Sequence, residues 1–216
     1  MRAIGIGAGG HAKVLLEALL SRADVDVVGL LDADRARHGT HVLGVMVLGG
    51  DELLDKLHRE GVTHAFIGIG GVGDNGPRRR VYELVHDAGF KLLEVVHPSA
   101  VVSPSATIGD GVAVCPGAII GASARLGDNV IINSGAIVEH DCLVANHSHV
   151  ASGAVLAGGV MVGESAHVGA GATVKQGLRI GKGAIVAMGA AVIEDVPDGI
   201  TVAGVPAKPI SARVQS

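Results

Sequence analysis

The second half of the chain carries an aliphatic side chain at every sixth position. From Val102 to Val192 all sixteen positions at this spacing are Val, Ile or Leu, and the position four residues further on holds a small or modest side chain. A six-residue period fits neither an α-helix nor an alternating strand. It is typical of a hexapeptide β-solenoid, whose coils bury their apolar side chains only against neighbouring coils. We therefore predict an all-β solenoid over residues 98–200, followed by a C-terminal tail at 201–216.

Residues 1–97 have a different pattern, in which predicted strands alternate with amphipathic helices. This order is typical of an α/β domain with a parallel sheet, here a Rossmann-like half-domain. We predict strands at residues 2–6, 25–32, 63–71 and 90–96, and helices at 12–20, about 51–60 and 77–88.

A glycine turn joins the first predicted strand to the first predicted helix. Gly5, Gly7 and Gly10 form the pattern G-x-G-x-x-G, and Asp32 ends the second strand about 20 residues later, as in dinucleotide-binding folds. The amide groups of such a helix N-terminus attract phosphate. Tight packing of the strand on the helix would also explain the glycines. Because the module is about half a complete dinucleotide-binding fold, we predict one bound nucleotide rather than NAD(P).

Composition narrows the class of protein. The aromatic residues Phe66, Tyr82 and Phe90 all precede residue 91, which is consistent with a solenoid bore too narrow for rings. A net charge of -4 gives no sign of a nucleic-acid surface. Two cysteines cannot form a disulfide framework, and we find neither a signal peptide nor an apolar run of about 18 residues. We expect a cytoplasmic protein that does not enter a membrane.

A cluster of titratable residues interrupts the solenoid pattern at residues 137–153, IVEHDCLVANHSHVASG. His140 and Asp141 fall outside the inward-facing positions, so we expect both side chains to point outward. A histidine suits general-base catalysis near neutral pH, and a neighbouring carboxylate can fix its tautomer. Cys142 falls on an inward small position, and a buried thiol is inert. We therefore favour direct attack by an acceptor over a covalent cysteine intermediate.

Four ordered motifs connect both halves to a known family: GAGGHAK at 7–13, HPSAVVSPSA at 97–106, INSGAIVEHD at 132–141 and VAGVPAK at 202–208. The chain resembles the hexapeptide-repeat sugar acetyltransferases. Within them it is similar to the branch of nucleotide-linked 4-amino-4,6-dideoxysugar N-acetyltransferases and sialic acid O-acetyltransferase-like proteins. The resemblance implies a left-handed parallel β-helix of about five coils, acetyl-coenzyme A as co-substrate, and a homotrimer with active sites between subunits.

The resemblance also implies roles for individual residues. His140 matches the general base, Asp141 its acidic partner, and Asn133 a polar group at the same site. Gly158 lies one coil beyond His140 and matches an oxyanion-binding N–H. The residues that match acetyl-coenzyme A contacts are His149, Ala170, Met188 and Lys208, with a solvated lysine as the alternative for Lys208. The residues that match the contacts of a nucleotide-linked amino sugar are Gly9, Gly10, His11, Asp32 and Gly70.

The sequence offers further candidate residues among its arginines and histidines. Arg78, Arg79 and Arg80 either pair with phosphates or form a basic helix face. We interpret His147 and His167 as surface residues. The spacing of the histidines does not match the three-histidine zinc site of hexapeptide-fold carbonic anhydrases, so we expect no metal.

The sequence thus predicts an acetyl-coenzyme A-dependent N-acetyltransferase. Its acceptor would be the 4-amino group of a nucleotide-linked 4-amino-4,6-dideoxyhexose, such as GDP-perosamine or a bacillosamine precursor, and its product would feed surface polysaccharide or glycan synthesis. One alternative is a sialic acid-type O-acetyltransferase, and another is a non-catalytic scaffold that binds sugar nucleotides. The sequence leaves the nucleotide base open among UDP, GDP and dTDP.

Overall fold

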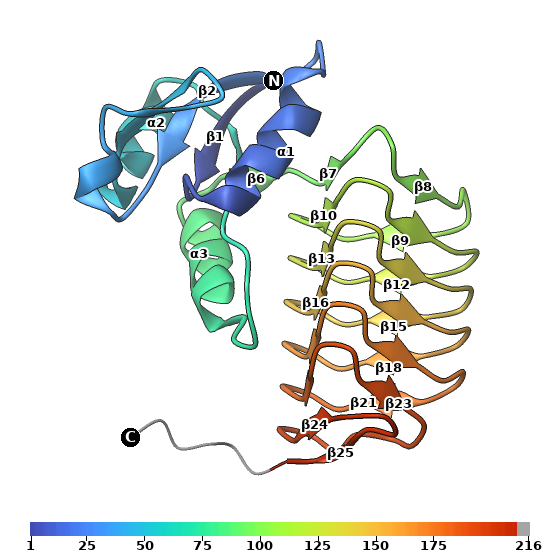
Figure 1. The fold of residues 1–216 in the computed structure, drawn as a ribbon. Helices are drawn as coiled ribbons and strands as arrows, with labels where there is room; N and C mark the ends of the chain where they lie inside the picture. The colour runs from blue at the N-terminus through green and yellow to red at the C-terminus, as the bar shows by residue number, and fades with distance from the viewer. Residues whose placement is uncertain (211–216) are drawn as a thin grey trace, which may run out of the picture.

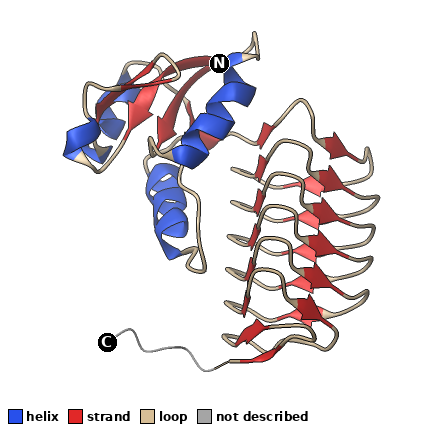
Figure 2. Ribbon diagram, in the orientation of Figure 1, coloured by secondary structure: helices blue, strands red, loops and turns tan. Residues whose placement is uncertain are grey.

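The computed structural model describes residues 1–210, which form an α/β domain beside a long triangular prism (Figure 1). All the helices of this part of the chain belong to the α/β domain, and short strands stacked in parallel build the prism (Figure 2). Within residues 1–210 no helix is long and apolar enough to cross a lipid bilayer.

The α/β domain has one sheet in the strand order β3-β4-β2-β1-β5-β6, parallel except for the β3–β4 pair. Its strands are β1 (Arg2–Ile6), β2 (Asp26–Leu31), β3 (His41–Val42), β4 (Val45–Gly49), β5 (His64–Ile67) and β6 (Lys91–Leu92). Its helices are α1 (Gly10–Leu20), α2 (Leu54–Arg59) and α3 (Gly76–Asp87), with short 3₁₀ helices at Arg35–Arg37 and Asp51–Leu53. The predicted strand–helix alternation is confirmed for β1, α1, β2, α2, β5 and α3.

Two features of this domain differ from the sequence prediction. The hairpin of β3 and β4 was not predicted, because polar and apolar residues do not alternate along it as they do in a half-buried strand. The strand predicted at 90–96 is split in two. Lys91 and Leu92 pair with β5, whereas Val95 and Val96 pair with the prism strand Ala113–Val114. The prism therefore begins at Val95, before the boundary at residue 97 that the sequence predicted.

The prism has three faces, each a sheet of parallel strands two residues long, except that face A ends in the three-residue strand β24 and its antiparallel partner β25. Face A contains β7 (Val95–Val96), β10 (Ala113–Val114), β13 (Ile131–Ile132), β16 (His149–Val150), β19 (His167–Val168), β22 (Ile185–Val186) and the terminal strands β24 (Thr201–Ala203) and β25 (Lys208–Pro209). Face B contains β8 (Val101–Val102), β11 (Ile119–Ile120), β14 (Ile137–Val138), β17 (Val155–Leu156), β20 (Thr173–Val174) and β23 (Ala191–Val192). Face C contains β9 (Thr107–Ile108), β12 (Arg125–Leu126), β15 (Leu143–Val144), β18 (Met161–Val162) and β21 (Arg179–Ile180).

One register runs through the prism. Each strand from β7 to β20 pairs with the strand 18 residues further on, for example Ile132 with Val150. The aliphatic residues of the six-residue series point inward and form one continuous core with the small residues four positions after them. The predicted solenoid is confirmed. After Val192 the register shortens, since Ile185 pairs with Thr201. The segment expected as a tail at 201–216 thus adds β24 and β25 to face A, while its residues 211–216 lie outside the described part.

Arg78 joins the two units. Its guanidinium is 2% exposed and donates to the carbonyl oxygens of Ile67 and Ile69 on one side, each at 2.7 Å. On the other side it donates to Gly111 of the prism at 3.0 Å. Burial lowers its pKa to about 9, so it remains charged at neutral pH. Of the two interpretations of the arginines, phosphate pairing is wrong for Arg78, which holds the α/β domain against the prism.

The inward orientation of the six-residue aliphatic series can be tested on two neighbouring residues of β15. Val144 points inward and is 2% exposed, whereas Leu143 points outward and is 40% exposed. Val144→Ala should lower the free energy of unfolding by roughly 1–3 kcal/mol through lost burial and a cavity. Leu143→Ala removes a larger side chain but should cost clearly less. Urea unfolding of both variants measures this, and an equal or larger loss for Leu143→Ala would contradict this inward orientation.

Candidate active site

The corner between faces B and C carries the predicted base. The Nδ1 atom of His140 lies 2.8 Å from Oδ2 of Asp141, and both side chains are exposed. Because a carboxylate only accepts, Nδ1–H of the ring donates to Asp141, and in the neutral imidazole this leaves the lone pair on Nε2. The imidazole lies flat against the next coil, where a Cβ added to Gly158 would approach Nε2 to 2.6 Å. A glycine at 158 is therefore needed for the ring to occupy this position.

Gly158 also leaves a backbone donor free. The neighbouring amide of Gly159 donates to the carbonyl oxygen of His140 at 2.8 Å, which fixes the two coils together. Within residues 1–210 the N–H of Gly158 has no acceptor. The exposed imidazole of His140 thus lies beside a buried glycine whose backbone N–H is free. A base nitrogen near a free N–H is the pairing that acyl transfer to an amine requires.

Asp141 has backbone strain at this corner. Its φ is 61°, in the left-handed region, whereas the same corner position one coil later is Gly159. Left-handed backbone is unfavourable for residues other than glycine, although Asp and Asn adopt it more readily than most. Strained residues of this kind cluster at functional sites. Ser123, Asn129, His147 and Ser165 have the same left-handed backbone at other corners of the prism, so the strain at Asp141 is a general feature of these corners.

A second cluster of polar residues lies at the corner between faces A and B. Nδ1 of His149 is 2.8 Å from the carbonyl oxygen of Gly71, and Nε2 is 3.1 Å from Nδ2 of Asn133. A carbonyl only accepts, so Nδ1–H of His149 donates to Gly71 and Nε2 accepts from Asn133. The imidazole therefore connects the loop after β5 with the prism.

His149 and His167 stack one above the other on face A. Their ring centroids are 4.9 Å apart in an edge-to-face arrangement. They are only 4% and 7% exposed, because the α/β domain covers them. Burial, followed by the neighbouring His167, lowers the pKa of His149 to about 4, so His149 is neutral at pH 7. The interpretation of His167 as a surface residue is wrong, since a six-residue period says nothing about what covers the outer face.

A cavity of about 560 Å³ lies between the α/β domain and this corner. Asn133, His149 and the predicted coenzyme contacts Ala170 and Met188 line it from the prism. From the α/β domain it is lined by Gly10, His11 and the loop 70–73. Burial is the main cause that lowers the pKa of His11 to about 3, and the buried Nε2 of this ring has no partner within residues 1–210.

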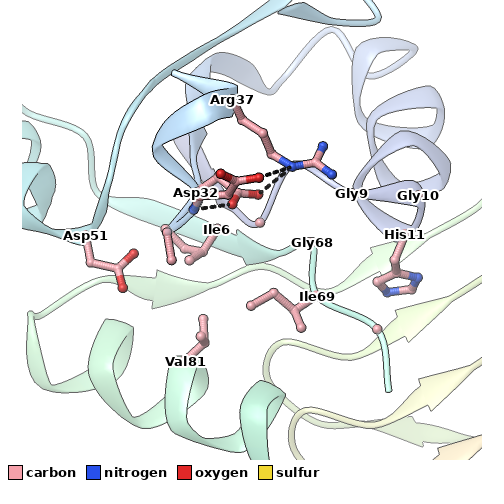
Figure 3. Close-up of a pocket in the computed structure, with 14 residues that line it drawn as sticks. Ile6, Gly9, Gly10, His11, Asp32, Arg37, Asp51, Gly68, Ile69 and Val81 are labelled. Atoms are coloured by element: carbon pink, nitrogen blue, oxygen red, sulfur yellow. Dashed lines mark hydrogen bonds and ion pairs between the residues drawn. The ribbon is translucent and has the colours of Figure 1, made fainter. Parts of the chain in front are cut away.

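A second cavity, of about 470 Å³, adjoins the first and shares Gly10, His11 and Gly70 with it (Figure 3). Gly7 has a φ of 97° and a Cβ there would meet Ile69 at 2.7 Å, so packing explains this glycine. A Cβ on Gly9 or Gly10 would meet nothing within 4 Å. Packing therefore does not require glycine at these two positions, where the N-terminus of α1 faces the cavity and can bind an anion.

Asp32 lines the same cavity at the end of β2. One carboxylate oxygen accepts from the N–H of Ala8 at 2.7 Å, and the other from the N–H of Asp34 at 2.9 Å. Asp32 thus holds the glycine turn in place. Its predicted position beside the turn agrees with the structure, and its own hydrogen bonds use both oxygens.

The other candidate residues lie elsewhere. Lys208 is paired with Glu194 at 3.5 Å, and Arg79 pairs with Glu83 and Glu164. His147 is half-buried against Tyr82 of α3, with ring centroids 5.3 Å apart, so it belongs to the contact between the domains. Burial raises the pKa of the Cys142 thiol, in agreement with the predicted inert cysteine. In the described residues no three His, Cys, Asp or Glu side chains converge as metal ligands would.

The structure does not bring His140 and Asn133 together within one chain. Asp141 and Gly158 accompany His140 at the corner between faces B and C, whereas Asn133 lines the cavity at the other edge of face B. Both residues can therefore belong to one site only if that site lies between two copies of the chain, as the resemblance implies. Arg78 and His167 are the residues whose positions sequence reasoning missed, since only the docking of the two domains gives them their surroundings.

Comparison with known proteins places this architecture in a family. The PglD N-terminal domain model matches residues 3–85, and the bacterial transferase hexapeptide (six repeats) model matches residues 123–158. The UDP-N-acetylbacillosamine N-acetyltransferase of Bacillus subtilis is 38% identical over 110 residues. That match covers 50% of this chain and only about half, 49%, of the curated relative.

Two solved structures resemble the chain over nearly its whole length. A histidine-to-asparagine variant of perosamine N-acetyltransferase from Caulobacter crescentus, in complex with CoA and GDP-perosamine, is 43% identical with a TM-score of 0.90, and the match covers 98% of this chain and 97% of that one. The acetyltransferase domain of PglB from Neisseria gonorrhoeae, in complex with acetyl coenzyme A, is 40% identical with a TM-score of 0.87, covering 97% and 98%.

The fold and site define a left-handed parallel β-helix protein of the hexapeptide acyltransferase class, with an N-terminal α/β domain. The chain belongs to the family of hexapeptide-repeat sugar N-acetyltransferases that use acetyl-coenzyme A, within the branch that acetylates nucleotide-linked amino sugars.

The strain at Asp141 leads to a prediction with a matched control. Asp141→Gly should keep or raise the free energy of unfolding, by up to about 1 kcal/mol, because glycine relieves the left-handed backbone. The same change should slow coenzyme A release in an acetyl-transfer assay at least about 10-fold. Ser123→Gly alters the equivalent corner one coil earlier, where φ is 58°. It should leave the rate unchanged, and a clear destabilisation by Asp141→Gly would contradict the assignment of strain.

Proposed function

We propose that the protein transfers the acetyl group of acetyl-coenzyme A to the 4-amino group of a nucleotide-linked 4-amino-4,6-dideoxyhexose. One observation carries the proposal: the imidazole of His140 lies between the Asp141 carboxylate and Gly158, whose N–H has no acceptor in the described part of the chain. The nucleotide-type cavity of the α/β domain supplies the second half of the substrate. In this proposal the product is used in the cytoplasm for surface polysaccharide or glycan synthesis.

The proposed chemistry is a direct transfer. The amine of the sugar attacks the thioester carbonyl while Nε2 of His140 takes a proton from the nitrogen. Asp141 holds Nδ1–H and stabilises the imidazolium that forms. The N–H of Gly158 donates to the oxyanion, and coenzyme A leaves as the thiol. A covalent step on Cys142 is not part of the proposal, because its buried thiol donates to the carbonyl oxygen of Ala157 at 3.2 Å.

A second copy of the chain completes the proposed site. The His140 corner and the cavity beside Asn133 border opposite edges of face B. The outward side chains of this face include Val101, which is 61% exposed, together with Ile119, Ile137, Val155 and Ala191. Three prisms packed through face B around one axis would bury these residues and bring the His140 edge of one copy to the cavity edge of the next. This supports a homotrimer with active sites between subunits.

Within this proposal the other predicted residues receive their roles. Gly9, Gly10 and His11 bind the diphosphate and the sugar, beside Asp32 and Gly70. Ala170 and Met188 form part of the coenzyme groove next to Asn133 and His149. The relatives support an amine acceptor, since one is named for UDP-N-acetylbacillosamine and another was crystallised with GDP-perosamine.

A substrate panel tests the function. Coenzyme A release should be fast with at least one of three nucleotide-linked 4-amino-4,6-dideoxysugars, carrying GDP, UDP or dTDP, and absent with a sialic acid. His140→Asn should fold normally and lower turnover at least about 100-fold, the usual scale for a general base. His41→Asn, an exposed histidine outside both cavities, is the control and should keep full turnover.

Two outcomes would overturn the proposed function, and a third would overturn only the role of His140. Acetylation of a sialic acid alone would indicate the O-acetyltransferase instead. No binding of acetyl-coenzyme A in calorimetry would indicate the non-catalytic scaffold. Near-normal turnover of His140→Asn would exclude His140 as the base while leaving the acetyl transfer itself in place.

A further inference from the structure

The nucleotide cavity extends across the carboxyl ends of four neighbouring strands. In sheet order these are β4, β2, β1 and β5, and the residues that follow them are Asp51, Asp32, the glycine turn and Gly68. In Figure 3 Asp51 and His11 lie at opposite ends of the labelled residues, with Asp32 between them. If the diphosphate binds at the turn and the sugar extends past His11, as proposed above, the base of the nucleotide extends towards Asp51.

The polar groups in the middle of this cavity already have partners in the protein. Both oxygens of Asp32 accept backbone N–H groups. Asp34 accepts from the N–H of Ala36 at 3.0 Å, and its other oxygen lies 3.6 Å from Nε of Arg37. Arg37 donates to the carbonyl oxygen of Ala8 at 3.0 Å. These residues stabilise the shape of the cavity and contribute few free groups for recognising a base.

Asp51 is different. Its half-buried side chain lines the cavity, and within residues 1–210 no N–H or O–H donates to its carboxyl group. Burial, and then the nearby Glu52 and Asp32, raise its pKa. A carboxylate without a donor favours a ligand that brings donors. The apolar side chains of Ile6 and Val81 line the same cavity and suit the faces of a planar base.

We infer that Asp51 reads the base of the bound nucleotide and selects guanine. The inference rests on the proposed function, because it assumes that the cavity holds a nucleotide-linked sugar. Guanine presents two adjacent donors, N1–H and N2–H, which match the two oxygens of a carboxylate. Uracil and thymine present one N–H between two carbonyl oxygens. A carboxylate repels these oxygens. Adenine presents one amino group beside a lone pair and matches less well.

Calorimetry with nucleoside diphosphates tests this inference without any acetyl transfer. The unmodified protein should bind GDP about 10–100-fold more tightly than UDP, dTDP or ADP, the usual range for one bidentate contact. Asp51→Asn should lose this preference. It should bind UDP at least as tightly as the unmodified protein does, because an amide can accept from the uracil N–H and donate to a carbonyl. Asp55→Asn, an exposed change on α2, is the control and should keep the preference for GDP.

The possible failures can be distinguished. Equal or tighter binding of UDP, dTDP or ADP by the unmodified protein would overturn guanine selection and leave the nucleotide-sugar function in place. A preference for GDP that survives in Asp51→Asn would exclude Asp51 as the residue that selects guanine. Failure of the unmodified protein to bind any of the four diphosphates would contradict the proposed function, and the inference with it. If Asp51→Asn does not fold, the order of affinities in the unmodified protein still decides whether guanine is selected.

Discussion

The stacking of aliphatic side chains inside the prism fixes the rest of the molecule. Because each coil buries its apolar residues only against the next, a one-residue slip would expose a whole file of Val, Ile and Leu. The register therefore stays at 18 residues from β7 to β23. It places every corner directly above the equivalent corner, and in this way Gly158 comes to lie under the imidazole of His140. A repeat that is needed for burial thus also positions reactive groups.

The prism could be predicted almost completely from the sequence, because its period repeats sixteen times. So could the position of Gly158 beside His140, which follows from counting one coil, whereas the pairing of His140 with Asp141 was implied by the family resemblance. What the sequence did not reveal depends on non-periodic contacts. His167 has the spacing of an exposed residue, but the α/β domain covers it. Arg78 belongs to a run of three arginines, and only its carbonyl partners on both domains distinguish it. The β3–β4 hairpin lacks polar alternation and was missed for that reason.

Because the two domains are docked against each other, the cavity at the glycine turn adjoins the cavity beside face A. Arg78 is a buried charge that is satisfied only by carbonyl oxygens, so its removal would leave several acceptors unpaired. His149, neutral at pH 7, adds a hydrogen bond between the loop after β5 and the prism. The glycine turn is held beside face A by these contacts, and the two cavities meet at His11. The base at the other edge of face B remains apart from these cavities in a single chain.

In the proposed trimer one copy supplies His140 and the next supplies the cavity, and a subunit-mixing experiment tests this arrangement. His140→Asn removes the base, and Ala170→Trp fills the cavity on the other edge. Each variant alone should be inactive. When equal amounts are unfolded together and refolded, random assembly should restore acetyl transfer to about a quarter of the unmodified rate, because one neighbouring pair in four joins an intact base to an intact cavity. A mixture no more active than the separate variants would contradict a shared site.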